Sequence, residues 1–213
     1  MVRKFRERSC SLKLRKFVYL ISPNKIKKTF YKDLESVLSY KNVKYFQLRL
    51  KNYKQNHIIK IAKKIKRITK KYRVSLIIND SVELTKKTKA DGCHLGQKDD
   101  LLKFARKNLK NKIIGVTCHN SKFLAKVALK DKANYLAFGS FNKSRLKPKA
   151  SRANLNILKW AKKNTKKPIV AIGGINNLNY KKLIKNGAKY IAISSYIWDN
   201  PHLKPKTAIR KFI

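Results

Sequence analysis

Three residues suited to binding an anion alternate along one short segment of the chain. Gln47, Arg49 and Lys51 are separated by single residues, so an extended strand would place all three side chains on one face. Burying such a row inside a sheet or barrel is costly unless an anion balances the charge. The spacing therefore predicts a site for a phosphorylated ligand at the end of this strand.

Acidic residues are scarce, yet half of them fall in one stretch. The chain has only 10 Asp and Glu residues, and five of these are Asp80, Glu83, Asp91, Asp99 and Asp100. Helix capping and helix-start charges would explain Glu83 and Asp100. The other interpretation is a divalent-metal site, because hard cations prefer carboxylate oxygens.

Two pairs of small residues follow apolar segments near the C-terminus. Gly173-Gly174 could hold a phosphate on backbone N–H groups, although a tight loop would explain the pair as well. Ser194-Ser195 could complete the same phosphate site. The sequence therefore offers cations, carboxylates and a second candidate phosphate cradle.

The sequence contains no convincing acid–base dyad. His94 falls within an apolar segment, which favours a structural histidine over a catalytic base. His119 follows the next such segment and could contact a substrate. Cys118 has no activating neighbour in the sequence, so nothing indicates a reactive thiol.

These residues need elements to position them, and the hydrophobic pattern supplies eight repeats of strand and helix. Apolar segments typical of buried parallel strands occupy 17–22, 45–50, 75–79, 92–96, 113–118, 135–141, 168–175 and 190–197. Amphipathic segments follow them at 28–40, 56–72, 81–89, 100–109, 121–133, 154–165, 177–187 and 202–212. The pattern predicts a single (β/α)8 TIM barrel over 17–213, with a doubly wound open sheet as the alternative. The candidate residues would then meet at the carboxyl ends of the strands, and 1–16 would form a basic N-terminal extension.

The composition limits the classes of partner. A formal net charge of +45 suggests nucleic acid, but the lysines are spread along the chain on the polar faces of the predicted helices. We therefore do not expect nucleic acid as a partner. No apolar run is long enough to span a membrane, no signal peptide is evident, and three cysteines make no disulfide framework. A cytoplasmic protein is expected, and an oligomer is compatible with the sequence.

Several ordered motifs resemble the thiamine phosphate synthase family. They lie at 47–51, 78–80, 91–99, 114–119 and 171–175, and the resemblance extends from about Phe17 to Pro201. It implies a TIM-barrel transferase of thiamine biosynthesis that joins a hydroxymethylpyrimidine diphosphate to a thiazole phosphate and releases pyrophosphate. It also implies Mg²⁺ as the cofactor, with ligands at Asp80 and Asp99.

The resemblance assigns a substrate role to further residues. The matching positions imply that the pyrimidine diphosphate is bound by Gln47, Arg49, Lys51, Asn79, Thr117 and Lys147, with Arg49 and Lys147 as electrostatic stabilisers. They imply that the thiazole phosphate is bound by Ser144, Gly174, Ser194 and Ser195. No acid–base residue is implied.

The segment 139–147 departs from the family pattern of Gly-Pro-x-x-Pro-Thr-x-Thr-Lys. Lys147 is kept and Ser144 keeps a hydroxyl, but Leu146 replaces the second Thr and both prolines are missing. Two other interpretations stay open: a related thiazole tautomerase, which would not need the complete acidic metal site, and an inactive basic barrel that binds nucleic acid.

Overall fold

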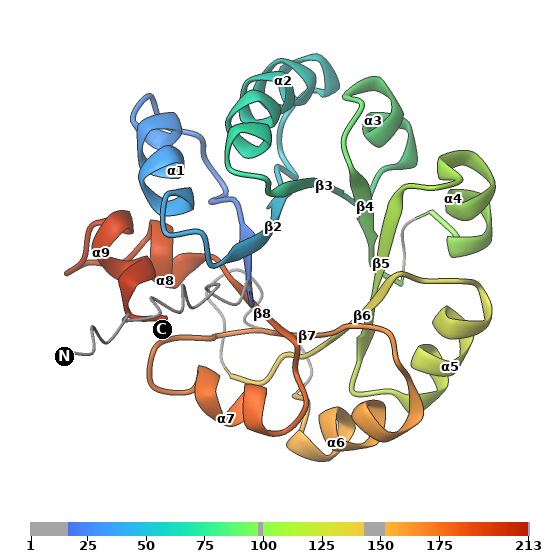
Figure 1. Cartoon of the computed structure of the whole chain (residues 1–213). Helices are drawn as coiled ribbons and strands as arrows, with labels where there is room; N and C mark the ends of the chain where they lie inside the picture. The colour runs from blue at the N-terminus through green and yellow to red at the C-terminus, as the bar shows by residue number, and fades with distance from the viewer. Residues whose placement is uncertain (1–16, 98–99, 143–151, 213) are drawn as a thin grey trace, which may run out of the picture.

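The computed structural model describes residues 17–97, 100–142 and 152–212, and these form a closed barrel of eight parallel strands (Figure 1). Each strand pairs with its neighbours in sequence, and β1 closes the barrel on β8. The strands are β1 (Val18–Ile21), β2 (Val43–Leu48), β3 (Ser75–Asn79), β4 (Gly92–Leu95), β5 (Ile113–His119), β6 (Tyr135–Phe138), β7 (Ile169–Ile172) and β8 (Tyr190–Ile193). The predicted TIM barrel is confirmed, and the open sheet is excluded.

The helices of the described residues surround the barrel. They are α1 (Phe30–Leu38), α2 (Gln55–Lys71), α3 (Val82–Lys87), α4 (Leu102–Leu109), α5 (Lys122–Lys130), α6 (Leu155–Asn164), α7 (Tyr180–Lys185), α8 (Ser195–Trp198) and α9 (Pro205–Arg210). In α2 the buried residues Ile58, Ile61, Ala62, Ile65 and Thr69 recur every three or four positions and face the strands. In these residues no helix is both long and apolar enough to cross a bilayer.

Several predicted strands extend beyond the observed ones, and the largest difference is at the end of β8. The hydrophobic pattern predicts a single strand over 190–197, but β8 ends at Ile193 and the short helix α8 begins at Ser195. Ser194 leaves the extended conformation, with φ −133° and ψ −81°. A short buried apolar run has the same pattern in a strand as in a single helical turn, so periodicity could not separate the two.

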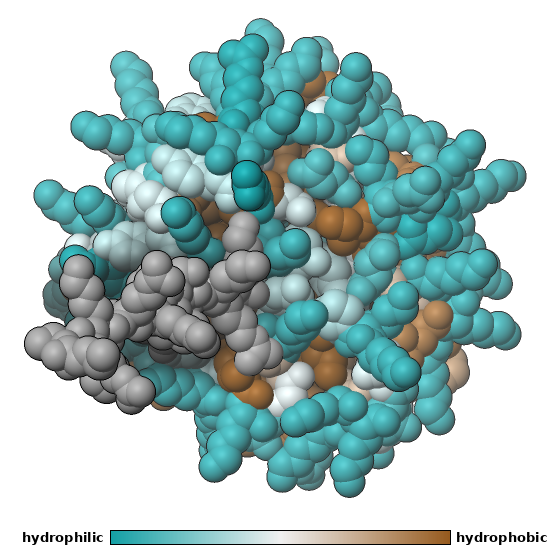
Figure 2. Space-filling view, in the orientation of Figure 1, coloured by the Kyte–Doolittle hydropathy of each residue, from teal (hydrophilic) through white to brown (hydrophobic). Residues whose placement is uncertain are grey.

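Lysines cover the outer surface. Figure 2 shows long hydrophilic side chains projecting all around this face of the molecule. On α2, for example, Lys60, Lys63 and Lys70 are exposed, while Ile61 and Ile65 between them are buried. The lysine-rich segments are therefore the solvent faces of amphipathic helices, as the sequence predicts.

Aromatic residues fill the interior of the barrel. Tyr19, Tyr45, Tyr135 and Tyr190 are all buried there, and their rings contact one another at centroid distances of 5.2 to 5.7 Å. Gly115 on β5 pairs with Tyr135 on β6, and its missing side chain leaves room for the Tyr135 ring. A Cβ atom at Gly115 would lie 1.8 Å from Cζ of that ring.

Replacing Gly115 with Ala is expected to lower the free energy of unfolding by roughly 1–3 kcal/mol, because the tyrosine ring must move in a packed core. Urea denaturation measures the change. In a Tyr135→Leu background the ring is gone, so the same Gly115→Ala change should cost much less. An equal cost in both backgrounds would contradict the steric explanation.

Candidate active site

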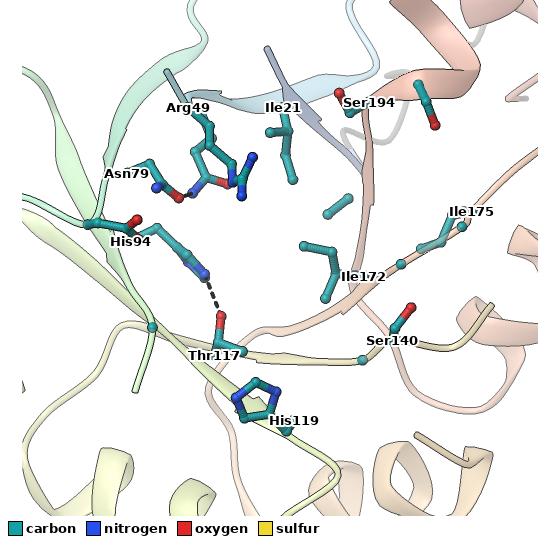
Figure 3. Close-up of a pocket in the computed structure, with 18 of the residues that line it drawn as sticks. Ile21, Arg49, Asn79, His94, Thr117, His119, Ser140, Ile172, Ile175 and Ser194 are labelled. Atoms are coloured by element: carbon teal, nitrogen blue, oxygen red, sulfur yellow. Dashed lines mark hydrogen bonds between the residues drawn. The ribbon is translucent and has the colours of Figure 1, made fainter. Parts of the chain in front are cut away.

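The carboxyl ends of the strands surround a cavity of about 360 Å³ (Figure 3). Every strand or the loop after it contributes to the wall, as the TIM-barrel fold requires of an active site. The wall includes nine of the residues that the sequence proposes as substrate or metal ligands: Gln47, Arg49, Lys51, Asn79, Asp80, Thr117, Gly174, Ser194 and Ser195.

The alternating row after β2 lines one side of this cavity. Gln47 is buried, and its amide Nε2 donates a 2.7 Å hydrogen bond to Oδ1 of Asn79 on β3. Arg49 and Lys51 come after the end of β2, which stops at Leu48 where the predicted strand extends to Leu50, yet both still line the cavity. The Arg49 backbone N–H donates to Ser22 Oγ at 2.9 Å, which fixes the chain where it leaves the strand.

The charge of Arg49 is partly buried at the cavity wall. Burial lowers the pKa of its guanidinium, and the nearby Asp80 carboxylate opposes that effect. The guanidinium nevertheless remains protonated near neutral pH, since the ordinary pKa of arginine lies far above neutrality. In Figure 3 the side chain extends toward the open cavity, where it presents a fixed positive charge to a ligand.

Asp80 occupies the turn between β3 and α3. Its φ of +66° lies in the left-handed region, which Asp tolerates better than most residues. Its backbone N–H donates to the carbonyl of His94 at 2.8 Å, and the next residue, Ser81, caps α3 by accepting from the Leu84 N–H. One Asp80 carboxylate oxygen lies 3.4 Å from Lys51 Nζ. The turn therefore sets a carboxylate and an ammonium group side by side at the cavity.

Three of the five clustered acids do not line the cavity and instead bind a backbone N–H or a lysine of the same helix. The Asp91 carboxylate accepts from the Leu76 N–H at 2.8 Å, and the Asp100 carboxylate accepts from the Val82 N–H at 2.9 Å. Glu83 forms an ion pair with Lys87 one turn along α3. These three acids therefore stabilise strands and helices. The capping interpretation is confirmed for Asp100, although its carboxylate caps α3 and not α4, the helix that follows Asp100 in the chain.

Among the described residues that line the cavity, Asp80 is the only one with a carboxylate side chain. Within 17–97, 100–142 and 152–212, no three His, Cys, Asp or Glu side chains come together as a metal cage. Mg²⁺ does not need one, because it retains several waters and binds through one or two carboxylates plus substrate phosphates. Asp80 would be one such carboxylate, beside the cationic side chains of Arg49 and Lys51.

Glycines shape the opposite wall after β7. Gly173 and Gly174 both have positive φ, +102° and +58°. A Cβ atom on Gly173 would lie 2.0 Å from Ser140 Oγ, so only glycine fits there. The Gly174 carbonyl accepts from Asn179 Nδ2 at 2.9 Å, which holds the loop. Ser194 and Ser195 lie beside this loop at the start of α8, the arrangement in which TIM barrels bind phosphate.

Three proposed site residues lie outside the described residues, namely Asp99, Ser144 and Lys147. Conversely, His94, Gln97, Ser140 and His119 line the cavity, although sequence reasoning gave none of them a definite role. Their positions at strand ends were the available signal. Cys118 is fully buried, and burial raises the pKa of its thiol to about 12, which agrees with an unreactive thiol at this position.

Comparison with known proteins identifies the family. The family model for thiamine monophosphate synthase matches residues 18–197. The chain belongs to this family. A thiamine-phosphate synthase of Pelagibacter ubique is 59% identical over 199 residues, which cover 92% of this chain and 96% of that protein. Another, from Erythrobacter litoralis, is 40% identical and covers 85% of this chain and 87% of that protein.

Solved structures agree with this membership. Thiamine phosphate pyrophosphorylase from Pyrococcus furiosus superposes with a TM-score of 0.82 at 27% identity, covering 94% of this chain and 95% of that one. A 3-hexulose-6-phosphate synthase superposes with a TM-score of 0.64 at 16% identity, a likeness of fold alone. This member of the thiamine monophosphate synthase family is thus a transferase of thiamine biosynthesis, with thiamine-phosphate synthase activity.

Proposed function

We propose that this synthase joins 4-amino-2-methyl-5-(diphosphooxymethyl)pyrimidine to 4-methyl-5-(2-phosphooxyethyl)thiazole, giving thiamine phosphate and pyrophosphate. The observation that carries the proposal is the grouping of Arg49, Lys51 and Asp80 on one wall of the cavity, opposite the Gly173-Gly174 loop. One wall suits a metal-bound diphosphate and the other a phosphate monoester. The two phosphorylated substrates would therefore meet between them.

In this proposal the pyrimidine diphosphate lies against β2, β3 and β5. Gln47, Asn79 and Thr117 have amide and hydroxyl groups that can orient a heterocycle, and Arg49 and Lys51 provide charges for the diphosphate. Lys147, outside the described residues, would add another cation. The hydrogen bond between the Gln47 and Asn79 amides fixes the orientation of both side chains, so the pyrimidine ring would bind to groups that are already in place.

The chemistry needs charge stabilisation more than proton transfer. The carbon–oxygen bond between the pyrimidine methylene and the diphosphate breaks, the electron pair leaves with pyrophosphate, and the thiazole nitrogen then bonds to the methylene carbon. Arg49 and Lys51 lower the energy of the departing anion because they are already in place when its charge grows. An acid–base dyad is unnecessary, since neither step transfers a proton.

Mg²⁺ is proposed as the cofactor, held by Asp80 and by Asp99, which lies outside the described residues. The ion would neutralise diphosphate charge and make the group a better leaving group. Asp80 would have to exchange its contact with Lys51 for the ion, which frees the Lys51 ammonium group for the diphosphate.

The thiazole phosphate is assigned to the loops after β7 and β8. Gly174, Ser194 and Ser195 border the cavity there, and Ser144, outside the described residues, would add a hydroxyl. A phosphate anchored at this wall would direct the thiazole nitrogen toward the methylene carbon, which is the main requirement for the second step.

Replacing Gly173 with Ala is expected to raise the KM for the thiazole phosphate by on the order of tenfold or more, because the new Cβ displaces Ser140 and strains the loop. Steady-state kinetics with each substrate varied in turn measures the effect. Gly187→Ala is the matched control, since Gly187 also has a positive φ, +118°, and lies outside the cavity wall. A similar rise in the control would show that backbone strain alone is responsible.

Binding calorimetry with each substrate alone tests the proposal against its alternatives. We expect the pyrimidine diphosphate to bind in the presence of Mg²⁺ and much more weakly in EDTA. A thiazole tautomerase would bind the thiazole ligand only. A nucleic-acid binder would hold neither substrate, and its affinity for duplex DNA would fall steeply with salt. Failure of the pyrimidine diphosphate to bind with Mg²⁺ would overturn the proposal.

We propose that the protein works in the cytoplasm with these two small molecules as its partners, and that nucleic acid is not among them. Burial of Cys93 and Cys118 as free thiols supports a reducing compartment. The spread of lysines over the described helices other than the short α8 supports a solvated surface in preference to a nucleic-acid interface.

A further inference from the structure

A chain of hydrogen bonds crosses the barrel interior and ends at the cavity. The Tyr19 hydroxyl on β1 lies 2.8 Å from the Tyr135 hydroxyl on β6, which lies 2.8 Å from His94 Nδ1 on β4. His94 Nε2 lies 2.8 Å from Thr117 Oγ1 on β5, the bond drawn in Figure 3. Thr117 lines the cavity, whereas Tyr19 and Tyr135 are fully enclosed below it.

The number of protons fixes the direction of this chain. Among the described residues Tyr135 is the only hydrogen-bond partner of the Tyr19 hydroxyl. If Tyr135 donated to Tyr19, the buried proton of Tyr19 would have no acceptor among the described residues, which carries the cost of desolvating a polar group. Tyr19 therefore donates to Tyr135, and Tyr135 uses its own single proton to donate to His94 Nδ1.

This direction determines the tautomer of His94. A neutral imidazole that accepts at Nδ1 carries its proton on Nε2. Nε2–H then donates to Thr117 Oγ1, and the Thr117 hydroxyl proton is left to donate to a ligand in the cavity. Burial raises the pKa of both Tyr19 and Tyr135 above the ordinary value, so neither hydroxyl loses its proton near neutral pH.

We infer that Tyr19 and Tyr135 are positioning residues that, through His94, make the Thr117 hydroxyl a hydrogen-bond donor toward a lone-pair acceptor of the pyrimidine diphosphate. The inference rests on the proposed contact between Thr117 and that substrate. It gives a role to three buried polar residues that the reaction itself does not use, and it explains why Tyr19 and Tyr135 stand where apolar side chains would pack without a polar cost.

Nuclear magnetic resonance of the ¹⁵N-labelled wild-type enzyme tests the direction without any substitution. The two-bond ¹H–¹⁵N pattern of His94, assigned with a His94→Gln variant, should show a protonated Nε2 and an unprotonated Nδ1. A protonated Nδ1 with a bare Nε2 would overturn the inference. This measurement needs no turnover, so it separates failure of this inference from failure of the proposed function.

Kinetics of Tyr135→Phe test the consequence for the substrate. Loss of this one hydroxyl should lower kcat/KM for the pyrimidine diphosphate about tenfold and leave KM for the thiazole phosphate unchanged. The single-tautomer pattern of His94 should be lost in the same variant. Unchanged kinetics, or a kinetic loss with an unchanged His94 pattern, would overturn the inference, because the effect would not run through His94.

Tyr45→Phe is the matched control. Tyr45 belongs to the same cluster and stacks on Tyr135 with ring centroids 5.7 Å apart, but its hydroxyl is not part of the chain. This variant should keep wild-type kcat/KM and the wild-type His94 pattern. A loss equal to that of Tyr135→Phe would assign the effect to general disturbance of the barrel interior and would overturn the inference.

Discussion

Replacing Asp80 with Asn should lower turnover by roughly a thousandfold or more, because a metal ion contributes several kcal/mol of charge stabilisation to a reaction of this kind. Asn has nearly the same shape and tolerates the φ of +66° found at this position. The fold should therefore persist, and what is lost is the negative charge that would attract Mg²⁺. Initial rates over a range of Mg²⁺ concentrations measure the effect, and the variant should need far more Mg²⁺ for any residual rate.

Asp91→Asn is the control for this prediction. Asp91 belongs to the same stretch of acids, but its carboxylate accepts the Leu76 N–H at the base of a strand and does not line the cavity. An Asn at this position can still accept that bond, so turnover and Mg²⁺ dependence should stay close to wild type. If Asp80→Asn kept its activity as well, Asp80 would be removed from the metal site.

Replacing Arg49 with Ala should lower kcat/KM for the pyrimidine diphosphate by roughly 100- to 1000-fold, the usual effect of removing one preorganised donor from a developing anion. Asp80 would also lose a nearby positive charge. Kinetics with each substrate varied separately measure the loss, and the KM for the thiazole phosphate should change little.

Arg67→Ala separates this local effect from the general field of a protein with net charge +45. Arg67 is an exposed residue of α2, so its removal takes away one charge without touching the cavity. Its kcat/KM should remain within about twofold of wild type, because surface charges contribute only weak, screened steering. A large loss in this control would mean that long-range attraction, and not contact, explains the Arg49 effect.

Much of the fold could be predicted from local pattern. Apolar runs of strand length alternate with amphipathic segments such as α2, and eight such repeats close into a barrel. The boundaries near the cavity could not be predicted as well. At Ser194 the chain turns from β8 directly into α8, and the apolar residues that follow suit either conformation.

The part of the candidate site that lies at the strand ends could be predicted, because the carboxyl ends of parallel strands meet at one end of the barrel. Gln47, Asn79 and Thr117 lie far apart in the sequence, yet parallel strands bring them to one cavity wall. The hydrogen-bond chain behind Thr117 was not predictable, because it depends on Tyr19 and Tyr135 facing each other across the barrel. The partners of two acids were not predictable either, because Asp91 accepts from the Leu76 N–H and Asp100 caps α3 instead of the helix that follows it.

Measuring both products of a single reaction is the direct test of Mg²⁺-dependent thiamine phosphate synthesis by this protein. The purified full-length protein is incubated with the pyrimidine diphosphate and the thiazole phosphate, once with Mg²⁺ and once with EDTA. We expect thiamine phosphate and pyrophosphate in equal amounts with Mg²⁺, and almost none of either with EDTA. No thiamine phosphate under conditions in which a known synthase works, or equal yields with and without Mg²⁺, would contradict it.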